Sequence, residues 1–87
     1  MQTRAKPIEV ITYSGTDGEL RPIKFRMCVE ENKQIVVPIL RIVSQQREKL
    51  AGNDMIRYRC LVKIDDLPKV IEIKYELDTC RWILFKT

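Results

Sequence analysis

The last third of the chain reads DMIRYRCLVKI (54–64), KVIEIKYEL (69–77) and CRWILFK (80–86), with only short connections between these segments. Apolar and polar residues alternate in each segment, and β-branched and aromatic residues are frequent. This is the pattern of a half-buried β-strand. We therefore predict three consecutive antiparallel strands joined by tight turns. The residues expected to face the core are Ile56, Tyr58, Cys60, Val62, Ile64, Ile71, Ile73, Tyr75, Leu77, Cys80, Trp82 and Leu84.

Side-chain chemistry favours one register for the first two of these strands. With residues 67–68 as the loop, Cys60 faces Tyr75 and Arg59 faces Glu76, so apolar residues meet apolar residues and cations meet acids. A register shifted by two residues would place like charges opposite each other. A shift by one residue would move the core residues to the solvent face. Burial and charge therefore favour the same pairing.

The second hairpin is predicted in the same way, with residues 78–79 in the turn. Tyr75 then meets Trp82, and Glu76 meets Arg81. Both pairs are of a kind that stabilises an antiparallel sheet.

Three further strands are predicted upstream, at 7–13, 21–29 and 34–43. The first two are joined by a turn that contains Asp17 and Gly18, a dipeptide suited to a type I′ turn because both of its central positions have positive φ.

The third upstream strand, 34–43, is apolar on both faces, as is typical of a central strand or of one at a dimer interface. Pro38 cannot donate to a hydrogen-bond ladder, which predicts an edge, a bulge or a bend. The segment 44–53 then breaks the β pattern. Ser44 is a good helix N-cap and Gly52 or Asn53 suits a left-handed helix exit, so we predict a helix of about two turns, with a loop as the alternative.

The predicted fold is mainly all-β. It is a small, curved antiparallel meander that closes into an SH3-like or similar barrel, with one short helix or helical turn near 44–52. An open sheet covered by the helix is the alternative. The length of 87 residues fits one domain. We expect a flexible basic N-terminus over 1–6 and a single β domain over 7–87.

Composition narrows the class of protein. The hydrophobic content of 45% and the charged content of 32% are ordinary for a folded soluble chain. No apolar run approaches the roughly 18 residues of a membrane span, and no signal-peptide pattern occurs at the N-terminus. A cytoplasmic protein without membrane contact is expected.

The chemistry-bearing residues do not indicate an enzyme. The chain has no histidine, and Cys28, Cys60 and Cys80 are widely spaced, so a disulfide framework or a zinc site is not predicted. Nucleophilic catalysis usually needs a base beside the nucleophile. The carboxylate pair Asp65 and Asp66 is explained by a turn. We expect no catalytic residue, no metal and no cofactor.

Two surfaces could bind a partner. One is basic: Lys24, Arg26, Arg57 and Arg59 point outward by strand parity and could follow a phosphate backbone. The net charge is +4, although acids on neighbouring strands are expected to neutralise part of this face.

The other surface is apolar. Ile83 and Phe85 point away from Trp82 and Leu84, so both faces of the last strand are hydrophobic. Such a face needs a cover, which an unknown protein partner or a second copy in a homodimer would supply.

The runs PIEVITYSGTDGELRPIKFRM (7–27), KLAGNDMIRYRC (49–60) and IEIKYELDTCRWILFK (71–86) resemble a family of small uncharacterised proteins from Gram-positive bacteria. The resemblance extends from Pro7 over nearly the whole chain. It implies a compact β domain with an unknown partner and implies no catalytic residues. Some proteins of similar layout accompany translesion DNA polymerases, which implies a link to DNA repair.

The sequence therefore predicts a non-catalytic binding or accessory module that acts through protein–protein contact or self-association. A nucleic-acid-binding accessory protein, associated with DNA repair and using the basic face, is the alternative, and an enzyme is a remote one. The two binding classes differ in salt dependence, because phosphate contacts weaken steeply as salt rises.

Overall fold

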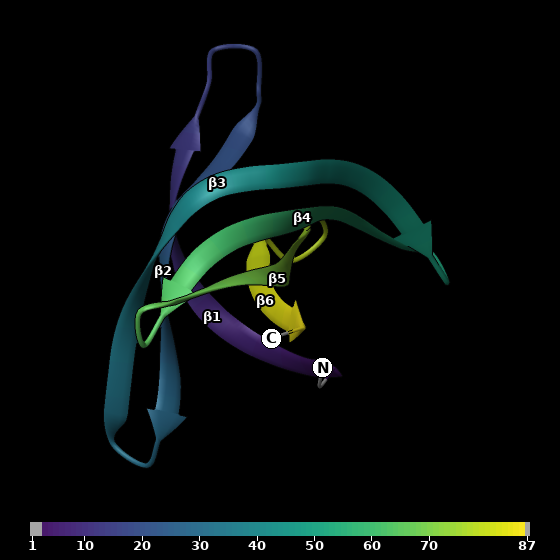
Figure 1. Cartoon of the computed structure of the whole chain (residues 1–87). Coiled ribbons are helices and arrows are strands. Elements are labelled where there is room, and N and C mark those ends of the chain that lie inside the picture. Colours follow the sequence, from purple (N-terminus) through teal and green to yellow (C-terminus); the bar gives the residue numbers. More distant parts are fainter. Residues whose placement is uncertain (1–2, 87) are drawn as a thin grey trace.

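The computed structural model describes residues 3–86, with the side chains of 5–28, 30–49 and 51–85, and it forms a closed antiparallel barrel (Figure 1). Each strand pairs with the next in the sequence, and the last pairs back with the first. The predicted all-β class and the closed, curved meander are confirmed. The strands are β1 (Thr3–Ser14), β2 (Leu20–Glu30), β3 (Lys33–Leu50), β4 (Asn53–Ile64), β5 (Leu67–Glu76) and β6 (Arg81–Lys86).

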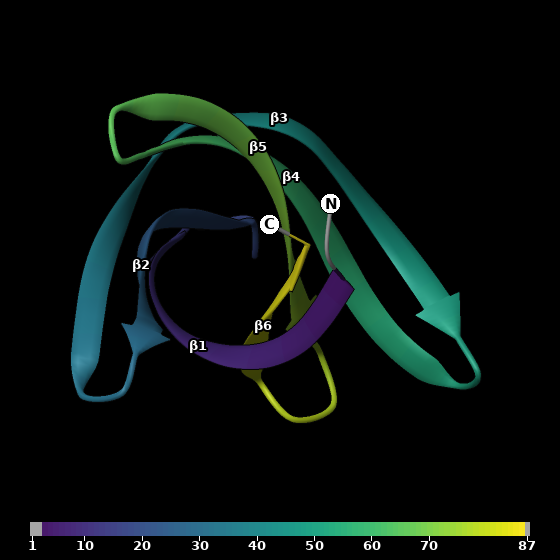
Figure 2. The ribbon, with the colours of Figure 1, turned by 60° about the horizontal axis from the view of Figure 1, so that its bottom comes forward.

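The barrel closes because two long strands change partner along their length. β3 pairs with β2 as far as Pro38 and with β4 from Ile39 onward. β1 pairs with β6 as far as Ile8 and with β2 from Glu9 onward. A β1–β2–β3 sheet and a β3–β4–β5–β6–β1 sheet thus share β1 and β3, and the strands follow one another around a ring (Figure 2).

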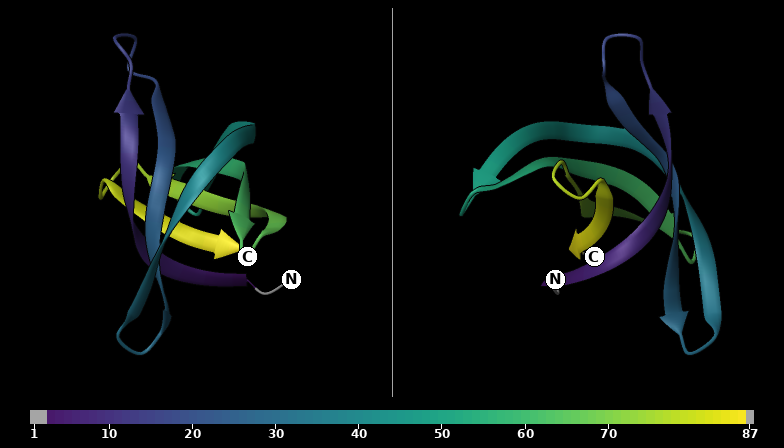
Figure 3. Two further views of the ribbon diagram at one scale, coloured as in Figure 1. Left: turned by 60° about the vertical axis from the view of Figure 1, so that its left-hand side comes forward. Right: turned by 180° about the vertical axis from the view of Figure 1, so that it is seen from behind.

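Pro38 lies where β3 leaves β2, and the first bulge in the ladder with β4 follows between Ile39 and Arg41. A residue without an N–H group is tolerated where a ladder ends. Of the edge, bulge or bend predicted at Pro38, the structure shows that the ladder with β2 ends there and that a bulge follows. The β1–β2 and β2–β3 hairpins project beyond the barrel in opposite directions, so β3 crosses much of the molecule (Figure 3).

The core contains a group of three neighbouring aromatic rings. The ring of Trp82 lies 5.4 Å from that of Tyr58 and 4.9 Å from that of Tyr75, measured between centroids. The buried Tyr58 hydroxyl donates to the Leu20 carbonyl at 2.7 Å, which satisfies its polar end. The buried hydrophobic residues are Phe25, Val37, Tyr58, Cys60, Val62, Ile71, Ile73, Trp82 and Leu84.

The short helix predicted over 44–53 is wrong. β3 continues as a strand to Leu50, pairing with the first half of β4, and Ala51 and Gly52 form the turn with φ of 51° and 80°. A helix of two turns is marginal without packing, because its nucleation is costly. The adjacent edge of β4 offers a hydrogen-bond ladder to the same residues, and this ladder prevails over local helix propensity.

The predicted register of β4 and β5 is also wrong. The turn is formed by Asp65 and Asp66, with φ of 52° and 63°, instead of residues 67–68. Cys60 consequently lies opposite Ile71, four residues from the predicted partner. Aspartate tolerates the left-handed conformation, and a two-residue turn of this kind matches the twist of the strands.

The second hairpin of the meander has the predicted register, with Tyr75 opposite Trp82 and Glu76 opposite Arg81. The turn places Cys80 in a left-handed conformation with φ of 57°, where its side chain is exposed. The inward orientation predicted for Cys80 is therefore wrong.

The N-terminal part differs from its prediction in two respects. Residues 3–6, which were expected in a flexible segment, belong to β1, and the Lys6 ammonium donates to the Cys28 carbonyl at 2.8 Å. Residues 1–2 of that segment lie outside the described part of the chain. In the β1–β2 turn only Gly18 has a positive φ, at 87°, so Asp17 does not adopt the predicted conformation.

Candidate binding surfaces

The four cations of the predicted basic face lie in two different sheets. Lys24 and Arg26 are on β2, in the sheet with β1 and the first half of β3. Arg57 and Arg59 are on β4, in the other sheet. No ion pair or hydrogen bond within residues 3–86 links the two pairs of cations.

Three of these four cations have a carboxylate partner within the chain. Because the exposed side chain of Arg26 pairs with Glu9, this cation is only partly available to a phosphate. The pairs on the other sheet are Arg57 with Glu48, at 3.7 Å between Nη1 and Oε2, and Arg59 with Glu72, at 3.8 Å between Nε and Oε1.

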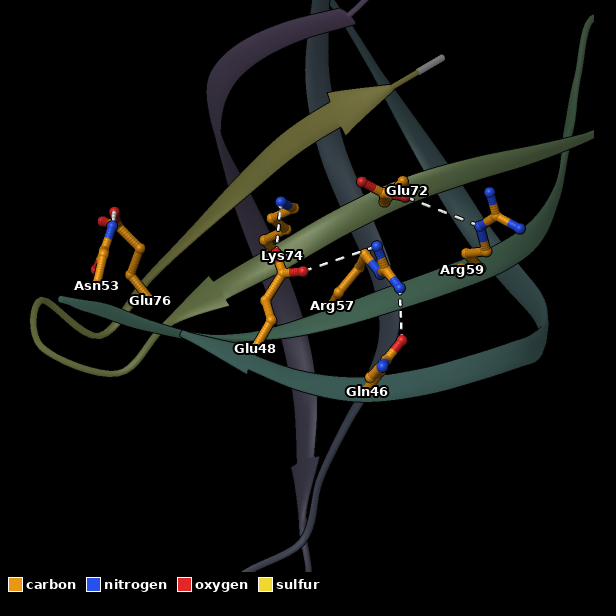
Figure 4. A network of polar contacts seen from close by, with 8 residues as sticks. All are labelled: Gln46, Glu48, Asn53, Arg57, Arg59, Glu72, Lys74 and Glu76. Carbon is orange, nitrogen blue, oxygen red and sulfur yellow. Dashed lines mark hydrogen bonds and ion pairs between the residues drawn. The ribbon is translucent and has the colours of Figure 1, made fainter. Parts of the chain in front are cut away.

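The outer face of β5 holds a buried ionic cluster (Figure 4). Glu72 and Lys74 point away from the barrel core, yet only 4% and 5% of their surfaces are exposed. The Lys74 ammonium lies 2.6 Å from Glu48 Oε1 and 4.0 Å from the centre of the Phe85 ring. Glu48 thus spans from β3 across β4, between Lys74 and Arg57, two cations that face each other directly in the ladder.

This cluster was not predicted from the sequence, because Glu48 lay in the segment interpreted as a helix. In a strand of that length, Glu48 has the parity that points it outward, two residues beyond Gln46, which accepts a hydrogen bond from Arg57 at 2.5 Å. The signal that could have placed Glu48 was the alternation of inward and outward residues, continued past residue 43 as in a longer strand.

Ile83 and Phe85, the predicted apolar interface, are partly covered by the chain itself. Both side chains are half-buried, and the Phe85 ring lies beneath the Lys74 ammonium. The aromatic face is therefore already engaged by a cation, an arrangement that stabilises both groups.

The most exposed apolar row lies on β3. Val36, Pro38 and Leu40 alternate along the strand and point outward, and Val43 follows beside a bulge. The exposed fractions are 59% for Val36, 58% for Leu40 and 47% for Val43. We call these four residues the β3 stripe. Its signal in the sequence was the strand at 34–43 that is apolar on both faces.

A groove adjoins the start of the β3 stripe. It has a volume of about 390 Å³ and runs over β1, β2 and β3. Its exposed walls come from Glu9, Ile11, Lys24, Arg26 and Val36, so apolar groups, two cations and one acid meet in it.

The reactive groups of the core are held in their neutral forms. Burial raises the pKa of the Cys60 thiol to about 12 and, as the largest cause, that of the Tyr58 hydroxyl to about 12. A thiol with so high a pKa is a poor nucleophile. Within the described residues no group of three or more Cys, Asp or Glu side chains could hold a metal ion.

Comparison with known proteins gives no relative: no protein-family model, no curated protein and no solved structure matches this chain. Residues 3–86 contain no helix that has both the length and the apolar character needed to cross a membrane.

Proposed function

We propose that the protein is a non-catalytic binding module that acts through protein–protein contact, with the β3 stripe as its docking surface. The observation that carries this proposal is the exposure of Val36, Leu40 and Val43 in one row of a closed barrel. Once the barrel has closed, an apolar row on its outer surface does not contribute to the core.

The size of the row supports an interaction site. About half of each aliphatic side chain is exposed, so the β3 stripe presents on the order of 300 Å² of apolar surface, the range in which patches on monomers are often functional. Ile11, with 57% exposed, and Ile23, with 43% exposed, extend apolar surface onto β1 and β2. The predicted site at Ile83 and Phe85 presents less, because Lys74 covers part of it.

The alternative of a nucleic-acid-binding accessory protein is supported less well. Arg26, Arg57 and Arg59 each lie beside a carboxylate, and the four proposed cations are divided between two sheets. A phosphate backbone would have to displace these carboxylates before it could release counterions.

The experiment that tests the proposal uses extract of the source cells and three forms of the purified protein. A crosslinkable tag is placed identically on the unaltered chain, on Leu40→Asp and on Tyr13→Asp. Tyr13 is 52% exposed near the β1–β2 turn, outside the β3 stripe, so its substitution controls for added surface charge.

We expect a protein that is captured by the unaltered chain and by Tyr13→Asp but lost with Leu40→Asp. If capture is the same for all three forms, the β3 stripe is not the docking surface. If only nucleic acid is captured, and binding weakens steeply with salt, the alternative function replaces the proposal.

A further inference from the structure

We infer that the partner of the β3 stripe is an acidic protein segment, in which carboxylates flank aliphatic residues. This inference rests on the proposed function and specifies the chemistry of its partner. It comes from the charged residues directly beside the stripe, which are cations, whereas the acid of the adjoining groove, Glu9, is paired with Arg26.

On the β2 side, the stripe is lined by two basic side chains. Lys24 lies directly opposite Pro38 in the ladder, and Arg26 lies directly opposite Val36. Residues directly opposite each other on an antiparallel pair have their side chains within contact range. Any group that packs on the first half of the stripe therefore meets these two cations.

Two further cations lie near the stripe, one on β3 itself and one on β4. Arg41 follows Leu40 directly and lies opposite Leu61, whose strand also carries Lys63 two residues further on. Arg41 and Lys63 are both exposed. The stripe thus has basic residues beside its first half on β2, within its own strand after Leu40, and on the neighbouring β4.

Part of this positive charge is uncompensated by the chain. Among the described residues, Lys24, Arg41 and Lys63 take part in none of the ion pairs. Glu9, which pairs with Arg26, lies across β2 from the stripe. Carboxylates from a partner would complement these cations, which favours association and fixes the orientation.

The same charges disfavour two other occupants. A second copy would bring the cations of one copy against those of the other, and like charges at an interface are costly. A nucleic acid would not be bound by the stripe itself. Proteins that bind single strands use aromatic rings on which bases stack, whereas Val36, Pro38 and Leu40 are aliphatic. The exposed ring of Tyr13 is already covered by Arg21, at 5.1 Å from the ring centre.

The experiment uses a displayed library of random 12-residue peptides as the probe. Peptides are selected on the unaltered protein and counter-selected on Leu40→Asp, so that only those that use the stripe are kept. We expect the enriched peptides to be rich in Asp and Glu together with Leu, Ile or Val. The affinity of one enriched peptide is then measured for variants of the cations beside the stripe.

Reversing one uncompensated cation is the decisive substitution. Lys24→Glu should weaken the selected peptide at least about tenfold, the size of effect expected for a like-charge contact at a docked surface. Lys49→Glu, at the far end of β3, is the matched control and should change affinity by less than about twofold. Arg41→Glu repeats the test at the second half of the stripe, and thermal melting confirms that each variant is folded.

Three results would overturn the inference. The first is enrichment of neutral or basic peptides. The second is that Lys24→Glu and Lys49→Glu bind the selected peptide with equal affinity. The third is a dimer, seen in sedimentation, that dissociates in Leu40→Asp. Each leaves the proposed function standing if the extract experiment still yields a Leu40-dependent protein. If no peptide and no protein depends on Leu40, both the inference and the proposed function fail.

Discussion

The outer faces of β5 and β3 depart from the usual distribution of polar and apolar groups in opposite ways. On β5, Glu72 and Lys74 are charged and buried, whereas on β3, Val36 and Leu40 are apolar and exposed. On β5 the chain itself supplies a counter-ion, because the Glu48 carboxylate pairs with the Lys74 ammonium. The β3 face has no such cover in the described residues.

This difference predicts that the outer face of β5 contributes to stability and that of β3 to binding. A buried charge needs a partner at all times, since an unpaired one costs several kcal/mol. An exposed aliphatic row costs little in the monomer and gains free energy only when something covers it. Substitutions on β5 should therefore reduce stability, and those on β3 should reduce binding. Both faces depend on the core beneath them.

The largest effect is expected for Trp82→Ala. The Trp82 ring packs between Tyr58 and Tyr75, so truncation should lower the free energy of unfolding by about 3–5 kcal/mol. Chemical denaturation monitored by circular dichroism measures this change. A loss below about 1 kcal/mol would show that both faces are supported by something other than this aromatic cluster.

Alkaline pH should weaken the same core. Folding raises the pKa of Cys60 from 9.0 to about 12 and that of Tyr58 from 10.0 to about 12, because burial disfavours the charged forms. Their contribution to stability is complete below pH 9, falls by up to about 1.4 kcal/mol per pH unit for each group as the unfolded chain ionises, and is lost near pH 12. Melting temperatures across this range measure the decline.

Cys60→Ala separates the two groups. With the thiol removed, the decline should begin near pH 10, where unfolded Tyr58 ionises, instead of near pH 9. A melting temperature that stays constant up to pH 11 would contradict the neutral, buried state of both groups.

The β5 face is tested by Glu48→Ala. Removing this carboxylate leaves Lys74 buried without a counter-ion and leaves it near Arg57, so we expect a loss of about 2–3 kcal/mol. Glu9→Ala is the matched control, because it breaks the exposed pair with Arg26 and should cost less than about 1 kcal/mol. Equal losses in the two variants would show that the buried ion pair on β5 stabilises the fold no more than the exposed pair of Glu9 and Arg26.

The two hairpins of the C-terminal meander show how far the sequence could specify the fold. For β5 and β6, an aromatic pair, Tyr75 with Trp82, and a charge pair, Glu76 with Arg81, select one register, which the structure confirms. For β4 and β5 the same criteria favour the wrong register, because the observed one places the cations Arg57 and Lys74 opposite each other. Glu72 and Glu76 lie four residues apart, so Arg59 meets an acid in either register.

The binding surfaces were predictable to different degrees, for a related reason. The apolar character of 34–43 on both faces was interpreted as that of a central strand or of one at a dimer interface, and the structure leaves one of these faces exposed. Glu48 was not placed, since the residues from Ser44 have the local signature of a helix. Pairing with β4, a contact distant in sequence, decides their conformation.

The turn that holds Glu48 in place offers a smaller, stabilising test. Ala51 has a left-handed φ of 51°, which non-glycine residues adopt at a cost and asparagine tolerates best. Ala51→Asn should therefore raise the free energy of unfolding by about 0.5–1 kcal/mol. Gly52→Ala, at φ of 80°, should lower it by about 1 kcal/mol, and the opposite signs distinguish a turn effect from a general surface effect.

The smallest effect on stability is expected for Leu40→Ser, on the face that we propose for docking. Because 58% of Leu40 is exposed, the free energy of unfolding should change by less than about 0.5 kcal/mol. Denaturation at two protein concentrations makes this measurement decisive. A loss of 2 kcal/mol that is independent of concentration would mean that the chain itself buries Leu40. The same loss at high concentration only would mean that a second copy covers the stripe, in place of an acidic partner.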